Sequence, residues 1–215
     1  MKRTESIIVN VFLAVMLPLT LSIFGWWMSA LLYLSRLAAL REAAVINGAL
    51  LGFGLGIIAL FSVFRWVKAR FYTLDLSFMA VIFLFWSFVS IAFLRGVPAG
   101  TIIVGMLAGL YVGRRSFHAG DDEPSFMAAR KKVSRLAAAV TGGLTLFIGV
   151  LMLRVPSTPA ALKGMLAVEQ LSSAGAAAIV IAAGIVLSIL QYAATAFAAS
   201  RAFRLEARSE SVSPL

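Results

Sequence analysis

Residues 130–153 read RKKVSRLAAAVTGGLTLFIGVLML, in which four basic residues precede an uncharged apolar run from Leu136 to Leu153. A helix needs roughly 20 mostly apolar residues to cross the hydrocarbon core of a bilayer, and it satisfies its own backbone hydrogen bonds there. The run is therefore long enough to span a membrane. Basic residues at its start are typical of the cytoplasmic end of a transmembrane helix.

Similar apolar runs, separated by Arg and Lys, follow one another along all 215 residues, of which 61% are hydrophobic and 13% charged. Soluble domains carry roughly 25% charged residues. The sequence therefore predicts an all-α, polytopic membrane helix bundle, with one domain over residues 1–215. The fourth run is the shortest and could instead re-enter the membrane from one side. The six predicted transmembrane helices are Ile7 to Tyr33, Val45 to Val67, Leu76 to Leu94, Pro98 to Val112, Leu136 to Leu153 and Ser173 to Ala199.

The distribution of basic residues predicts the orientation, because cytoplasmic loops near membrane ends carry the excess of Lys and Arg. With the N-terminus inside, 14 of the 19 basic residues lie on the cytoplasmic side. We therefore expect both termini in the cytoplasm, a cytoplasmic basic loop and helix start at 116–135, and an outer loop at 154–172. A bacterial or archaeal cytoplasmic membrane is the expected location.

The loop at 116–135 combines a predicted helix start with a basic cluster. Asp122 can accept hydrogen bonds from the free N–H groups of a first helical turn, and Pro124 suits that turn. His118 and three carboxylates lie nearby, but their spacing does not form a metal site. The basic side chains would meet anionic lipid headgroups or, alternatively, the acidic surface of a partner. These candidate anionic-lipid contacts are Arg130, Lys131, Lys132 and Arg135.

Glycine recurs at four-residue spacing in two of the runs. Residues four apart lie on nearly the same face of a helix, and glycine lets two helix backbones approach closely. Close packing within the chain is the favoured interpretation, with a dimer interface or a backbone-lined pore as alternatives. The two rows are Gly48, Gly52 and Gly56 in the second run and Gly105, Gly109 and Gly113 in the fourth.

Polar side chains within the runs are few and uncharged, since all nine acids fall in loops, tails or at the ends of runs. Ionisable groups inside a membrane normally mark proton and ion paths. Their absence argues against proton-coupled, sodium-coupled and metal transport. We predict no catalytic residue, no metal and no cofactor. The candidate contacts to a solute or a neighbouring helix are Thr20, Ser87, Thr145, Ser188 and Gln191.

Three classes of function fit this pattern. The favoured one is a transport component or facilitator for an uncharged or amphipathic solute. The alternative is a non-enzymatic scaffold or assembly subunit of a larger membrane complex. A lipid-modifying enzyme, with Asp75 and His118 as its only candidate pair at the cytoplasmic face, is the least favoured. The expected partners are the lipid bilayer, anionic headgroups, and another membrane subunit or a second copy of the chain. Nucleic acid is not expected, because the basic residues sit at the ends of apolar runs.

The predicted orientation can be tested by labelling, since the chain contains no cysteine. Single cysteines introduced at Ser116, Ser125 and Ser209 should resist an impermeant thiol reagent in intact cells, whereas a cysteine at Ser157 should react. Labelling at position 125 without labelling at position 157 would reverse the orientation.

Overall fold

The computed structural model describes residues 3–35, 41–70, 76–93, 99–155 and 172–211. These ranges contain six helices and no strand, so the all-α class is confirmed. The helices are α1 (Arg3–Leu34), α2 (Ala43–Arg70), α3 (Leu76–Phe93), α4 (Ala99–His118), α5 (Glu123–Leu153) and α7 (Ser173–Ser211).

Four of these helices, α1, α2, α5 and α7, are long and apolar enough to cross a membrane, which indicates an integral membrane protein. The apolar segment of α3, Ser77–Ala92, is shorter. In α4 the apolar part ends at Gly113, directly before Arg114 and Arg115.

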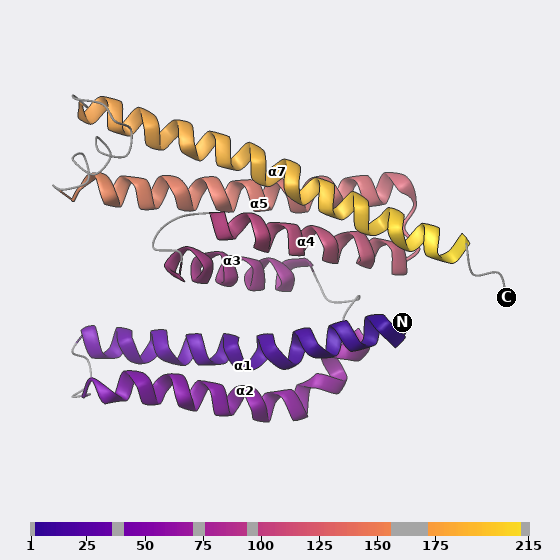
Figure 1. The fold of residues 1–215 in the computed structure, drawn as a ribbon, viewed down its shortest axis with the longest axis horizontal. Coiled ribbons are helices and arrows are strands. Elements are labelled where there is room, and N and C mark those ends of the chain that lie inside the picture. The colour runs from indigo at the N-terminus through magenta and orange to yellow at the C-terminus, as the bar shows by residue number, and fades with distance from the viewer. Residues whose placement is uncertain (1–2, 36–40, 71–75, 94–98, 156–171, 212–215) are drawn as a thin grey trace. The chain divides into compact units, whose positions relative to one another are not determined.

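The chain divides into two compact units, Met1–Phe71 and Tyr72–Leu215. In the first unit, α1 and α2 lie side by side and run in opposite directions (Figure 1). The glycine row of α2 faces α1. A Cβ atom added at Gly52 would lie 2.8 Å from the carbonyl carbon of Leu21, and one at Gly56 would meet the backbone of Pro18. The Ser22 hydroxyl donates to the carbonyl oxygen of Ala49 across this contact, at 3.0 Å. The two backbones therefore touch where α2 has no side chain.

The second unit is built around α7, which packs against both α4 and α5, while α3 packs mainly on α4. Contacts between α4 and α7 advance in the same direction along both helices, from Gly105 near Gln191 to Gly113 near Ala202. These two helices are therefore parallel. Contacts between α5 and α7 advance in opposite directions, so the end of α4, the start of α5 and the end of α7 lie together (Figure 1).

The connection from α4 to α5 is only four residues long, shorter than the loop that the sequence suggested, because α4 continues to His118 and α5 begins at Glu123. Gly120 has a φ of 72°, and the amide of Asp121 donates to the carbonyl of Ser116 at 3.0 Å, which is a glycine-based helix end. Asp122 caps α5 by accepting from the amide of Ser125 at 3.1 Å. The predicted cap is therefore confirmed.

Two glycines of α2 provide a matched test of the backbone contact in the first unit. A Cβ atom at Gly52 would collide with the backbone of Leu21, whereas a Cβ atom at Gly54 would have nothing within 4 Å. Both Gly→Ala changes gain about the same helix propensity, up to roughly 1 kcal/mol. We expect Gly52→Ala to lower the apparent melting temperature in detergent and Gly54→Ala to leave it equal or slightly higher. Equal responses of the two variants would contradict the packing.

Candidate functional site

A cluster of four buried polar side chains lies where α4, α5 and α7 meet. Gln191 of α7 accepts a hydrogen bond on Oε1 from the Thr141 hydroxyl of α5, at 3.2 Å. Its Nε2 donates to Thr195 Oγ1, one turn further along α7, at 3.0 Å. Thr141 also lies 3.1 Å from Thr101 Oγ1 in the first turns of α4. All four side chains have no exposed surface.

Gly105 of α4 leaves the space that the Gln191 amide fills. A Cβ atom at this position would collide with Nε2 of Gln191 and would come within 2.8 Å of its Cδ and 2.9 Å of Thr195 Oγ1. Any other residue would therefore push the amide away from its partners. The cluster thus depends jointly on a missing side chain in α4 and a long polar side chain in α7.

The rest of the α4 glycine row continues this contact with α7. A Cβ atom at Gly109 would lie 3.2 Å from Cβ of Ala198, and one at Gly113 would lie 2.9 Å from Cβ of Ala202. Both rows, on α2 and on α4, therefore face helices of their own unit in the structure.

The other candidate polar residues bond mainly to their own helices. The hydroxyls of Thr20, Thr145 and Ser188 donate to the carbonyl oxygens four residues earlier, at 2.6, 2.7 and 2.7 Å. Ser87 differs, because its buried hydroxyl has no hydrogen-bond partner in the part of the chain that the structure describes.

Three members of the cluster, Thr101, Thr141 and Thr195, were not among the sequence candidates, because the sequence does not show which hydroxyls meet across helices. For Thr101, one signal was available. The signal that could have found it is its position four residues before Gly105, on the glycine face of the helix.

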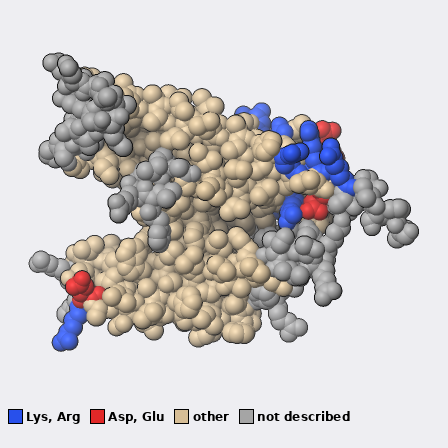
Figure 2. All heavy atoms as spheres, in the orientation of Figure 1, with Lys and Arg blue, Asp and Glu red and all other residues tan. Residues whose placement is uncertain are grey.

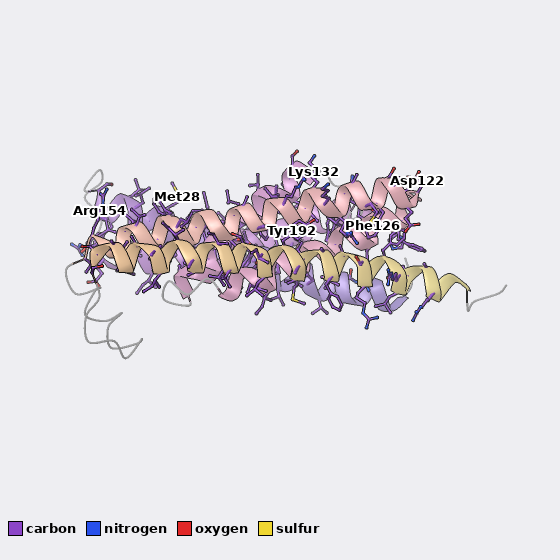
Figure 3. The ribbon with its side chains drawn as sticks, turned by 90° about the horizontal axis from the view of Figure 1, so that it is seen from above. Met28, Asp122, Phe126, Lys132, Arg154 and Tyr192 are labelled. Atoms are coloured by element: carbon purple, nitrogen blue, oxygen red, sulfur yellow. The ribbon has the colours of Figure 1, made fainter. Side chains whose placement is uncertain are left out.

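A second polar region occupies the end of the same unit where α4 stops and α5 begins. Phe203 of α7 stacks on Phe126 of α5 with ring centroids 4.2 Å apart and meets Phe117 of α4 edge-on. Arg114 Nε lies 3.2 Å from the Glu206 carboxylate, which is largely buried. These aromatic and ionic contacts join the three helices beyond their apolar parts. In Figure 3, Asp122 and Phe126 mark this end, and Arg154 lies at the opposite end.

Lys and Arg gather on the surface of this region, as Figure 2 shows. Of the predicted lipid contacts on α5, Arg130 is partly buried and donates from Nη1 to Ser200 Oγ of α7 at 2.9 Å, whereas Lys131, Lys132 and Arg135 are exposed. Arg201 of α7 is exposed too, and its guanidinium lies 5.8 Å from the ring centroid of Phe197.

Besides Glu206, this end carries acidic residues in the turn before α5. Hydrogen bonds from the side chain and then the amide of Ser125 hold the pKa of Asp122 below its usual value. The charged cap therefore stabilises the start of α5 fully above the unfolded-state pKa, and this contribution is lost as the pH falls through the lowered value. At neutral pH the cap is fully effective.

The described ranges contain no group of three His, Cys, Asp or Glu side chains that could hold a metal ion. Asp75, which the enzyme alternative pairs with His118, lies outside the described residues. The ring of His118 packs edge-on against Phe117.

The buried cluster of Gln191, Thr141, Thr195 and Thr101 can hold helices together by hydrogen bonds. It contains no group that titrates near neutral pH.

Comparisons with protein-family models, curated proteins and solved structures give no match to this chain.

The fit between Gly105 and Gln191 can be measured with a double-mutant cycle. Gly105→Ala alone should lower the apparent melting temperature, because the added methyl group displaces the amide. In a Gln191→Ala background the amide is absent, so the same change should cost little. We expect a coupling of about 1–3 kcal/mol, the range for residues in direct contact. Additive effects of the two changes would show that the contact contributes nothing.

Proposed function

We propose that this chain is a non-enzymatic membrane scaffold or assembly subunit, with six transmembrane helices and both termini in the cytoplasm. The orientation is supported by the charge at the two ends of α5, where Lys131, Lys132 and Arg135 precede the apolar run and Arg154 alone follows it within the described residues. Ser125 is exposed and Ser116 is buried, so position 125 is the more informative cytoplasmic site for the labelling test.

The proposal rests on the hydrogen bonds of the polar side chains inside the helices, most of which bond to groups of this chain. A facilitator needs donors and acceptors that line a path for its solute. Gln191 is the strongest candidate in this chain, yet its amide is fully buried and bonds to Thr141 and Thr195. Thr20, Thr145 and Ser188 bond to their own helices. All of these groups therefore already have partners within the chain, which fits a scaffold better than a path lined for a solute.

The exposed face of α2 is the surface that we assign to a partner helix. Asn47, Leu51, Gly54 and Ile58 follow one another at four- and three-residue spacing, which places them on one helix face, away from the row that meets α1. Leu50 and Leu55 flank Gly54 and complete an open groove. A small residue between large aliphatic ones allows close approach of a second transmembrane helix.

A solute facilitator is the second candidate, and one observation favours it. The Ser87 hydroxyl is completely buried and has no hydrogen-bond partner within the described residues. A buried hydroxyl normally has a partner, because leaving it without one costs about 1–3 kcal/mol. An uncharged or amphipathic solute could supply that partner.

Site-specific photo-cross-linking in cell membranes tests the scaffold proposal. A photoreactive residue in place of Leu51, whose side chain is 70% exposed, should give one discrete protein adduct. Filling the groove with Gly54→Leu should abolish that adduct. The matched control is Gly143→Leu on α5, because both glycines have nothing within 4 Å of an added Cβ atom.

Lipid adducts alone at position 51, or equal loss of the adduct in both variants, would contradict the scaffold proposal. Solute flux through the purified protein in proteoliposomes, reduced by Ser87→Ala and unaffected by proton or sodium gradients, would establish the facilitator instead.

A further inference from the structure

Several cations on α5 and α7 are exposed near this end of the second unit, and four of them lie near the level where its apolar surface begins. They are Lys131, Lys132 and Arg135 on α5 and Arg201 on α7, which together are called the basic belt here. Arg130 is not part of the belt, because it already bonds to Ser200.

The Arg130–Ser200 hydrogen bond aligns the two antiparallel helices and so sets the relative depths of the belt residues. At a rise of about 1.5 Å per residue, Arg135 lies roughly 7.5 Å from Arg130 toward the apolar run, and Lys131 and Lys132 lie roughly 1.5–3 Å from it. Arg201 lies roughly 1.5 Å beyond Ser200 on the other side. All four cations thus fall within a layer of about 9 Å, and long side chains can bring their charges into one headgroup region of roughly 5–7.5 Å.

The belt has apolar neighbours on one side, and the nearest acids among the described residues of α5 and α7 lie further from the apolar run or are already paired. Arg201 stands over the ring of Phe197, which is 61% exposed, and Arg135 directly precedes the exposed Leu136. Asp122 and Glu123 are the nearest acids on α5, and they lie roughly 10–12 Å further from the apolar run than Arg130. Glu206 is already paired with Arg114. Within the described residues, no ion pair to a belt residue is seen.

We propose that the basic belt binds the headgroups of anionic phospholipids, while Phe197 and Leu136 contact the first part of their acyl chains. This pairing of cations with exposed apolar side chains at one depth fits a lipid, which carries both chemistries in one molecule. The inference does not depend on the proposed scaffold function.

The experiment uses the full-length protein in phosphatidylcholine bilayers, with spin-labelled phosphatidylglycerol compared with spin-labelled phosphatidylcholine as the boundary lipid. The parent should prefer phosphatidylglycerol, and 1 M salt should weaken this preference, because exposed charges are screened. Replacing Lys131, Lys132 and Arg135 with Gln should lower the relative association constant by at least about fivefold, since each cation near an anionic surface contributes about 1 kcal/mol.

Two controls separate the belt from net charge and from misfolding. Arg154→Gln, at the opposite end of α5, should keep the preference, and so should the charge-preserving variant Lys131→Arg/Lys132→Arg/Arg135→Lys. All variants should keep the helicity and the melting temperature of the parent. No preference in the parent, full preference in the Gln variant, or an equal loss in Arg154→Gln would overturn the proposal.

Discussion

In a bilayer, apolar side chains gain nothing by leaving lipid, so helices associate through contacts that lipid cannot make. In this protein the contact is backbone against backbone at glycine. Gly52 meets Leu21 within the first unit, and Gly109 meets Thr195 and Ala198 within the second. Where no side chain stands between two helices, dispersion contacts and hydrogen bonds such as Ser22 to Ala49 become available. The remainder of each unit is arranged around these lines of close approach.

The cluster of Gln191, Thr141, Thr195 and Thr101 fixes the axial register of this packing. Dispersion contacts between glycine and alanine would tolerate a shift of one helix along the other. An amide that must reach Thr141 and Thr195 while lying over Gly105 does not tolerate such a shift. The polar groups thus select one register of α4, α5 and α7, the role that buried polar residues can have in helical assemblies.

The sequence predicted the helical class, the Asp122 cap and the four helices that are long and apolar enough to span a membrane, because these depend on local composition. It did not predict the end of α7, which continues to Ser211, well beyond the apolar run that ends at Ala199. Hydropathy locates the segment that can face lipid, whereas a helix continues as long as other contacts, such as those of Phe126 with Phe203, support it.

The sequence also did not show which glycine and alanine residues would contact a neighbouring helix. The glycine row of α4 meets Ala198 and Ala202, while Ala174, Ala178 and Ala182, which share the four-residue spacing, are exposed. Spacing shows that residues share a face, but only the tertiary arrangement decides which face is used. Thr101 was missed for the same reason, since its partner, Thr141, belongs to another helix.

The four-residue turn around Gly120 has a consequence for membrane insertion. Such a short, capped connection leaves no slack between α4 and α5, so the two helices would enter a bilayer as one hairpin. The apolar part of α4 is short and glycine-rich, and on its own it would partition weakly. In the proposed six-helix arrangement, the strongly apolar α5 would bring α4 into the bilayer with it, and the glycine face of α4 would then meet α7.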